Sequence, residues 1–324
     1  MTLASQRWLH DRTSSYDPAL RAQLLDSLLA APRRPTVCVA IPARDEEPTV
    51  AGVVGPVQEL LVASGLVEEV VVVDGESGDA TAARAADAGA RVVHLADVLD
   101  TSTHPGKGGA MWAALATTTA DVVVFLDADV EPFDPGWVCA LLQPLFRDPA
   151  VQLVKGAYDR PVRGGAPHAI GGRVTELVAR PLLNLLWPEL SGVLQPLAGE
   201  CAARRSLLST LPFSTGYGVE FGLLVDTWAT AGLGALAQVD LGARHHRHHD
   251  DAVVARMAAS VLHTALRRLE QQGRGRLAVP PQDVLHQVLR SSAGPLTVQP
   301  FDVASSDLPP IAGRGTRAGT GRGA

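Results

Sequence analysis

Between residues 36 and 126, short apolar runs alternate with longer amphipathic segments. The run Val122-Val123-Val124-Phe125-Leu126 is apolar at every position, which is typical of a strand covered on both faces in a parallel sheet. We predict strands at residues 37–41, 69–73, 91–94 and 122–126, with helices at residues 49–64, 80–88 and 108–118 between them. Strands alternating with helices predict an α/β fold, with a mostly parallel, Rossmann-like sheet flanked by helices.

The rhythm breaks in the second half of the chain. We predict a strand at residues 151–158, a glycine-rich loop at residues 163–172, and a helix from about Val174 that is broken at Pro181 and Pro188. This half therefore predicts a lobe added beside the sheet.

The two ends of the chain follow other patterns. Residues 1–35 predict an N-terminal arm, and residues 251–272 carry apolar side chains at helical spacing. That helix is expected to pack on the core, with a subunit interface as the alternative. The tail from Ser305 is rich in glycine, arginine and proline and is predicted to be disordered. The chain is thus divided into residues 1–35, 36–155 and 156–250, a C-terminal helical region at residues 251–304, and the tail at residues 305–324.

The composition is that of a globular protein. The chain has 324 residues, 46% of them hydrophobic, which is ample for a sizeable core. Its formal net charge of -6 argues against a nucleic-acid partner. Its three cysteines are widely spaced, which disfavours a disulfide framework and fits a reducing compartment. No apolar stretch approaches the length of a membrane span, so we expect a cytoplasmic protein without a membrane partner.

The chemistry begins where the last apolar run ends, at Asp127-Ala128-Asp129. In an extended segment residues i and i+2 share a face, so the two carboxylates can point together. Carboxylates completed by phosphate oxygens and water are how proteins usually hold Mg²⁺, and a nucleoside diphosphate is the candidate ligand. A solvated turn at the strand end is the alternative.

The ends of the first two strands also carry polar loops. Residues 42–47, Pro-Ala-Arg-Asp-Glu-Glu, precede a helix and suit a base and ribose, although acidic residues there could merely complement the helix dipole. In residues 74–81, Ser77 or Asp79 could cap the next helix, and Gly75 would let a ligand approach the backbone.

Two glycine-flanked segments predict anion sites at helix starts. Residues 104–109 lack the first glycine and the Ser or Thr of a P-loop, but they place Lys107 where a diphosphate could lie. Residues 169–176 contain two glycines, an arginine and a threonine, which suit a second, smaller anion, with an ordinary helix start as the alternative.

Residues 244–249, Arg-His-His-Arg-His-His, form the densest cluster of nitrogen ligands in the chain. Their spacing lacks the separation of a structural zinc site, so at most one or two are expected to contact a metal. A solvated basic turn is the alternative for the rest.

Taken in order, these segments resemble one family. From about Thr36 to His249 the chain resembles the actinobacterial glucosyl-3-phosphoglycerate synthases, which are retaining glycosyltransferases with the A-type nucleotide-sugar fold. The resemblance rests on seven blocks, at residues 42–47, 105–108, 127–129, 172–183, 194–200, 216–220 and 244–247. It implies that residues 36–155 bind the nucleotide sugar and residues 156–250 bind the acceptor.

For the donor side, the resemblance implies a uridine-binding loop, a lysine that reaches the diphosphate, and a metal. The implied donor-binding residues are Pro42, Ala43, Arg44, Glu46, Gly75, Lys107, Asp127 and Ala128. Serines are expected in place of Gly75 and Ala128. Asp129 and His246 would ligate a divalent cation, Mg²⁺ or Mn²⁺. UDP-glucose is the preferred donor, with GDP-glucose and ADP-glucose left open.

For the acceptor side, the resemblance implies a site for 3-phosphoglycerate. Its phosphate and carboxylate end would be bound by Gly172, Arg173, Val174 and Thr175. Tyr217, Arg244 and His248 would line the same side, with His248 in place of an expected asparagine. The implied catalytic residues are Glu220, Lys107 and Asp129, with Glu220 orienting the glucose or the acceptor hydroxyl. A homodimer is also expected.

Retention of configuration leaves two routes open. A covalent route needs a carboxylate beside the anomeric carbon, and Glu220 is the candidate. The preferred route lets a diphosphate oxygen take the acceptor proton instead. Rival functions are a mannosyl-3-phosphoglycerate synthase, a polyprenyl-phosphate glycosyltransferase, a nucleotidyltransferase and a catalytically silent nucleotide-sugar sensor.

Overall fold

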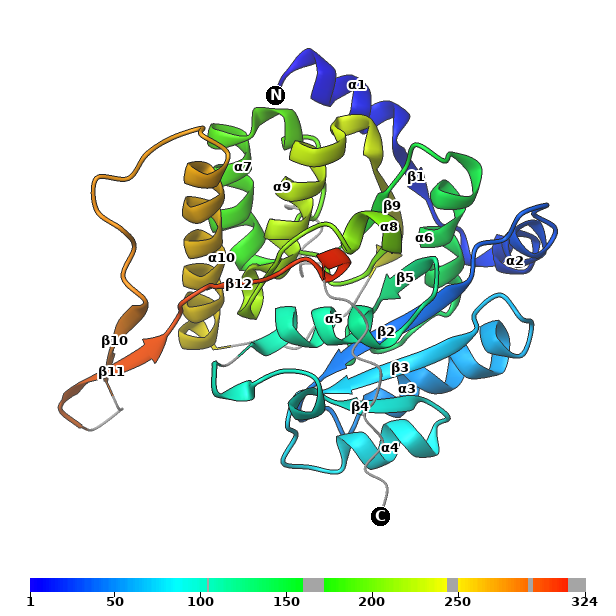
Figure 1. The fold of residues 1–324 in the computed structure, drawn as a ribbon, viewed down its shortest axis with the longest axis horizontal. Coiled ribbons are helices and arrows are strands. Elements are labelled where there is room, and N and C mark those ends of the chain that lie inside the picture. Colours follow the sequence, from blue (N-terminus) through cyan, green and yellow to red (C-terminus); the bar gives the residue numbers. More distant parts are fainter. Residues whose placement is uncertain (104, 160–171, 244–249, 291–293, 314–324) are drawn as a thin grey trace.

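The computed structural model describes residues 1–103, 105–159, 172–243, 250–290 and 294–313. Its centre is an eight-stranded sheet, in which all neighbouring strands are parallel except for the two pairs that β7 makes with β5 and β6 (Figure 1). In order across the sheet, the strands are β1 (Thr13–Ser15), β9 (Leu236–Ala243), β6 (Leu153–Asp159), β7 (Cys201–Arg204), β5 (Val122–Phe125), β2 (Val37–Ala43), β3 (Glu69–Asp74) and β4 (Arg91–His94). The predicted α/β fold with a mostly parallel sheet is confirmed.

Helices cover both faces of this sheet, because alternate residues of its central strands enter two separate cores. Val123 and Phe125 of β5 lie in one core, whereas Val122 and Val124 lie in the other. This double burial explains why β5 is apolar at every position. The α-helices are α1 (Leu3–Asp11), α2 (Arg21–Leu29), α3 (Val50–Pro56), α4 (Thr81–Asp87), α5 (Gly106–Thr117), α6 (Gly136–Arg147), α7 (Arg180–Leu186), α8 (Arg205–Leu208), α9 (Val219–Ala231) and α10 (Asp251–Gln271).

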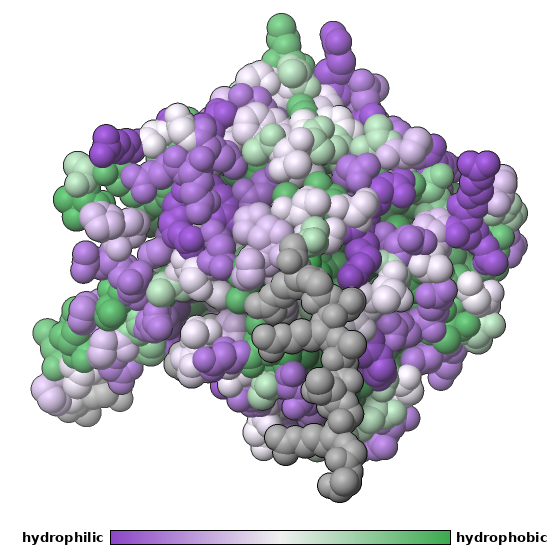
Figure 2. Space-filling view, viewed as in Figure 1, coloured by the Kyte–Doolittle hydropathy of each residue, from purple (hydrophilic) through white to green (hydrophobic). Residues whose placement is uncertain are grey.

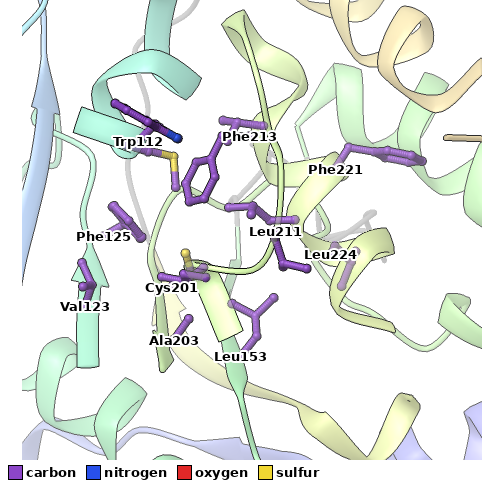
Figure 3. Close-up of a cluster of buried hydrophobic side chains, with 14 of the residues drawn as sticks. Trp112, Val123, Phe125, Leu153, Cys201, Ala203, Leu211, Phe213, Phe221 and Leu224 are labelled. Carbon is purple, nitrogen blue, oxygen red and sulfur yellow. The ribbon is translucent and has the colours of Figure 1, made fainter. Parts of the chain in front are cut away.

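The first core joins helices α5 and α9 to the sheet. Figure 3 shows Trp112 of α5 and Phe221 of α9 in one cluster with Phe125 of β5 and Cys201 of β7. All four side chains are nearly or fully buried. Because close packing leaves little freedom, this core fixes the first turns of α5 and α9 relative to each other.

The segment after the glycine-rich loop differs in detail from its prediction. A π-helical turn, η5 (Thr175–Ala179), runs directly into α7, and the predicted break at Pro181 is wrong. Pro181 is the second residue of α7 and follows directly on the wider π-helical turn, so the helix passes through the proline without a break. The chain does leave the helix at Trp187, just before Pro188.

The ends of the chain are more ordered than predicted. Strand β1 extends the main sheet beside β9, so residues 13–15 do not lie in a separate arm. The disorder predicted from Ser305 is wrong for residues 305–313, because β12 (Asp307–Leu308) pairs with β8 (Phe213–Ser214). Residues 314–324 lie outside the described part of the chain.

Between α10 and β12 lies a hairpin of β10 (Val284–Arg290) and β11 (Leu296–Asp302), where a helical region was expected. It projects from the body in Figure 1, and Figure 2 shows hydrophobic side chains on it. Val284, Val288, Leu296 and Val298 are exposed there. In the part of the chain that the structure describes, no helix is both long and apolar enough to cross a membrane.

Candidate active site

The candidate residues gather at one edge of the sheet. Strands β2, β3 and β5 are parallel, so the polar loops that follow them emerge together. Strand β7 runs the opposite way, and its first residue Cys201 pairs with Phe125 and Lys155. As a result, residues 194–200, which precede β7, arrive at the same edge.

Lys107 lies between two carboxylates from different parts of the chain. Its Nζ is 2.6 Å from Asp127 Oδ1 and 2.6 Å from Glu220 Oε1. Asp127 follows β5, Lys107 is on the first turn of α5, and Glu220 is on the first turn of α9. The structure therefore brings together three of the residues that the resemblance nominated.

The two carboxylates keep Lys107 protonated. Burial alone would lower the pKa of this ammonium, but Asp127 and Glu220 outweigh that effect and hold its pKa well above the ordinary value. The side chain of Glu220 is buried and that of Asp127 is about one-fifth exposed. A fixed positive charge thus stands at the sheet edge over a wide pH range.

Asp127 and Asp129 are both half-buried beyond the end of β5 at Phe125, and a turn begins at Ala128. The intervening side chains Leu126, Ala128 and Val130 are all buried in the second core, so the period of two continues past the strand. The buried Ala128 can therefore contact a nucleotide-sugar donor only through its backbone.

The oxygen donors at this edge fit a hard divalent cation such as Mg²⁺ or Mn²⁺. Asp127 and Asp129 follow β5 at this edge and carry two of those oxygen donors. Within the described ranges no three metal-binding side chains form a cluster. A cation bound by Asp129 would need further ligands in addition to these carboxylates. His246, the other predicted ligand, lies outside the described residues.

The loops after β2 and β3 lock each other in place. Asp45, at a φ of 57°, accepts a hydrogen bond from Gly78 N at 2.8 Å, and its own N–H donates to Ser77 Oγ at 3.0 Å. The Glu46 N–H donates to Thr81 Oγ1 at 2.8 Å. A rigid cradle results, built from the segment predicted to hold the base and ribose.

The donor residues in this cradle are presented in different ways. Ala43 is buried in the core, whereas the Arg44 side chain is exposed and can reach a ligand. Gly75 donates its N–H to Ala43 O at 2.8 Å, and a Cβ on Gly75 would lie 3.3 Å from that same oxygen. The absence of a side chain at Gly75 therefore lets the two loops meet closely.

Sequence reasoning missed Asp74, the last residue of β3. Its side chain is only 6% exposed, and its Oδ1 has no hydrogen-bond partner. Its Oδ2 lies 3.5 Å from His94 Nδ1 and accepts from Ser77 N at 3.3 Å. A buried carboxylate oxygen without a donor is costly, and here it points to an N–H or O–H group of a ligand. The available signal was a carboxylate ending a buried strand.

Gly199 was also missed as an individual residue. A Cβ at this position would lie 2.0 Å from Asp127 Oδ1, so only glycine allows the loop before β7 to touch that carboxylate. The neighbouring Ala198 carbonyl accepts a hydrogen bond at 2.5 Å from the buried Lys155. A lysine within the apolar run of β6 was the signal for this support.

On the acceptor side, the structure places several predicted residues near helix α10. This helix packs against both η5 and the short helix η7 (Gly216–Gly218). Arg173 forms an ion pair with Asp251, the first residue of α10. Thr175 is buried, while Tyr217 is 48% exposed and accessible to a ligand.

The remaining acceptor predictions are described only in part. Gly172 and Val174 are partly buried beside Arg173. Strand β9 ends at Ala243, at the same sheet edge as β6. Arg244 and His248, which follow it, lie outside the described residues.

Known proteins identify the class of this site. The parallel sheet, the carboxylate pair and the cradle are those of a glycosyltransferase that uses a nucleotide sugar, and residues 38–209 match Glycosyl transferase family 2. The chain belongs to that family, and its relatives include the glucosyl-3-phosphoglycerate synthases.

The relatives can be compared over most of their length. The glucosyl-3-phosphoglycerate synthase of Mycolicibacterium smegmatis is 47% identical over 265 residues, which cover 81% of this chain and 86% of that protein. The Mycobacterium tuberculosis enzyme in complex with Mn²⁺, UDP-glucose and phosphoglyceric acid superposes with a TM-score of 0.77 at 40% identity, covering 93% and 98% of the two chains. The mannosyl-3-phosphoglycerate synthase of Rubrobacter xylanophilus gives a TM-score of 0.82 at 36% identity, covering 95% and 98%.

Proposed function

We propose that this protein transfers glucose from UDP-glucose to the 2-hydroxyl of 3-phosphoglycerate with retention of configuration. The observation that carries the proposal is the Lys107 ammonium, held 2.6 Å from both Asp127 and Glu220. This ammonium joins Asp127, a carboxylate on the donor side, to Glu220, a carboxylate on the acceptor side. The relative from Mycobacterium tuberculosis, which binds Mn²⁺, UDP-glucose and phosphoglyceric acid, supports the same substrates here.

The donor half would bind the nucleotide in the cradle between the loops after β2 and β3. Pro42, Ala43, Arg44 and Glu46 would surround the uridine, and Asp74 Oδ1 would accept a hydrogen bond from it. Lys107 would stabilise the charge that develops on the departing diphosphate. Mg²⁺ or Mn²⁺, with Asp129 and His246 as its proposed ligands, would neutralise further charge on that group.

The acceptor half would recognise an anion. Arg173 is half-exposed on its helix start and, together with the Thr175 hydroxyl, offers charge-assisted hydrogen bonds to a phosphate or carboxylate. Tyr217 would line the same side with Arg244 and His248. A small acceptor with two anionic ends fits such a set better than a neutral sugar does.

Glu220 would position groups rather than form a covalent bond to glucose. Its Oε1 is held by Lys107, which lowers its availability as a nucleophile. Replacing it by Gln should reduce turnover about 100-fold, because the ammonium loses one of its two anchors. In the wild-type enzyme, which keeps the Glu220 carboxylate, rapid-quench mass spectrometry should detect no glucosyl-enzyme. A trapped glucosyl-enzyme, or rescue by azide with inverted product, would contradict this role.

The alternative donor is a GDP- or UDP-linked mannose, because the mannosyl-3-phosphoglycerate synthase superposes closely on this chain. The deciding experiment incubates the protein with 3-phosphoglycerate, Mg²⁺ or Mn²⁺, and a panel of nucleotide sugars. Products are analysed by mass and by anomeric configuration. We expect an α-linked glucosyl product from UDP-glucose. No transfer from any donor would refute the proposal, and transfer of mannose alone would favour the alternative.

A cytoplasmic homodimer is also proposed. Light scattering after size-exclusion chromatography tests the oligomeric state, and a monomer at working concentration would contradict it.

A further inference from the structure

Residues 303–313, called the C-terminal strap below, cross from the projecting hairpin to the segment that leads into α9 (Figure 1). Although these residues are far along the chain from Lys107 and Asp127, they make backbone bonds close to the candidate site. We propose that the C-terminal strap positions the active site by clamping residues 213–218 against α5. The proposal rests on the transfer reaction proposed above.

The clamped segment is the bridge between the two reacting halves. It begins with β8, continues through η7, and leads into α9 two residues before Glu220. Its Gly216 N–H donates to Pro105 O at 3.0 Å, directly before α5. A Cβ on Gly108 would lie 1.9 Å from Ser214 O. Because the two backbones touch, a shift of residues 213–218 moves Glu220 relative to Lys107.

The strap holds this bridge by backbone hydrogen bonds. Thr215 N donates to Ser306 O at 2.8 Å, and Ser306 N donates to Thr215 Oγ1 at 3.0 Å. One residue further on, Asp307 pairs with Ser214 in the β12–β8 ladder. Thr215 is the residue immediately before Gly216, so the strap acts directly on the contact with α5.

A buried ionic network fixes the strap to α9 and α10. The Arg268 side chain is 1% exposed and donates to Asp226 Oδ2 and to Asp307 Oδ2, each at 2.8 Å. It also donates to Ser214 Oγ at 3.2 Å, and Asp307 accepts a further bond from Arg267 at 2.8 Å. Asp307 thus links the strap directly to α10 and to the bridge, and through Arg268 to α9.

The far end of the strap is tied to α5 itself. Trp112, one and a half turns along α5 from Lys107, donates its Nε1–H to Pro309 O at 2.8 Å. Further on, Ala312 N donates to Ser209 O at 2.9 Å. The strap therefore touches the helix of Lys107 and the segment before Glu220, which makes Asp307 and Ser306 positioning residues for both.

The first test replaces Asp307 by Asn and compares the variant with Glu69→Gln. Glu69 accepts from Arg91 at 2.8 Å and from Thr118 at 2.9 Å, at the opposite end of β3 from the site. Both changes remove the charge of a carboxylate that accepts hydrogen bonds from an arginine and from other side chains. Well below both unfolding midpoints, Asp307→Asn should lower kcat about 10- to 100-fold at saturating substrates, and Glu69→Gln should leave kcat unchanged. Asp307→Glu should recover part of the loss.

A second test fixes the clamp covalently. The Thr215 and Ser306 hydroxyl oxygens are 3.3 Å apart, so Thr215→Cys with Ser306→Cys, added to Asp307→Asn, should form a disulfide on oxidation. Oxidation should restore kcat, and a reductant should remove the gain. The native Cys38, Cys139 and Cys201 are buried and would not interfere.

The outcomes separate the two proposals. A wild-type protein that transfers no glucose would refute the proposed function. A wild-type enzyme that is active, with Asp307→Asn turning over like Glu69→Gln, would refute the positioning role alone. Failure of the two cysteines to cross-link in the folded protein would also refute it, because it contradicts the contact between strap and bridge.

Discussion

The segments that form the donor half of the site are closer together in the sequence than the segments that form the acceptor half. The bonds that lock the donor cradle, Asp45 to Ser77 and Glu46 to Thr81, join residues 32 and 35 positions apart. Those of the acceptor half, Arg173 to Asp251 and Thr215 to Ser306, join residues 78 and 91 positions apart.

A strand–loop–helix repeat can position the donor loops, but it does not position the segments of the acceptor half. Each donor loop is placed by its own strand and helix, so the cradle follows from the fold of residues 37–129. The acceptor half has no such unit and depends on α10 and the C-terminal strap to hold its pieces together. Changes remote from the substrates should therefore disturb the acceptor half more than the donor half.

The largest effect is expected at Lys107, where the halves meet. Lys107→Met removes the ammonium and leaves Asp127 and the buried Glu220 without their shared partner. The kcat should fall about 1000-fold, because charge on the departing diphosphate is no longer stabilised. Steady-state assays with both substrates saturating measure this. A loss below about tenfold would mean that the two halves do not depend on this bridge.

The next effect isolates the donor half. Gly199→Ala would place a Cβ 2.0 Å from Asp127 Oδ1, so the carboxylate or the loop must move. We expect kcat/KM for UDP-glucose to fall about 100-fold. Gly52→Ala in α3 is the matched control, since a Cβ there meets nothing within 4 Å. Equal activity of the two variants would show that the Asp127 contact does not matter.

The third effect isolates the acceptor half. Arg173→Ala should raise KM for 3-phosphoglycerate about 30-fold, the equivalent of about 2 kcal/mol for a lost charge-assisted hydrogen bond. The KM for UDP-glucose should not change, which makes the donor an internal control. Little stability should be lost, because the partner Asp251 is 93% exposed. An equal rise in both KM values would refute the division into halves.

The smallest effect concerns the support of the acceptor half and appears in stability rather than rate. Burial raises the pKa of Asp226 to about 6, although Arg268 opposes the shift, and Asp307 raises it further. A raised carboxyl pKa means that stability is full below the ordinary value and is lost as pH rises through about 6. Asp226→Asn should remove this decline, which is on the order of 2 kcal/mol between about pH 4 and about pH 7.

Urea unfolding at several pH values measures this slope. Glu69→Gln provides a control of opposite sign. Burial would raise the pKa of Glu69, but hydrogen bonds from Arg91 and Thr118 lower it instead, so its stabilisation is lost as pH falls. An Asp226→Asn variant with the slope of the wild type would show that this carboxyl stays ionised throughout.

Much of the donor half could be predicted from the sequence because its elements have their own patterns. Strands β2, β3 and β5 are apolar on both faces, and the carboxylates after β5 keep the period of two. Asp74 and Gly199 could not be assigned roles in this way. Asp74 has an unpaired buried oxygen, and Gly199 approaches Asp127 closely. Both features exist only in the folded structure.

The acceptor half and the strap could not be predicted for the same reason. Strand β7 runs antiparallel to both of its neighbours within a mostly parallel sheet, and β12 has only two residues. Such short elements have no periodicity of their own and are held by partners distant in the sequence. Pro181 misled the prediction because proline commonly breaks a helix interior, whereas here the helix continues through it after a π-helical turn.

The order in which the strap is synthesised has a consequence for the newly made protein. The ribosome synthesises α9 and α10 before residue 307. Arg268 and Asp226 are therefore present before Asp307, the other carboxylate that Arg268 contacts. A nascent chain therefore holds the catalytic groups early but lacks the clamp that aligns them. Transfer activity should switch on late, when the strap has left the exit tunnel, and chains interrupted before it would be recognisable to proteases by their open interior.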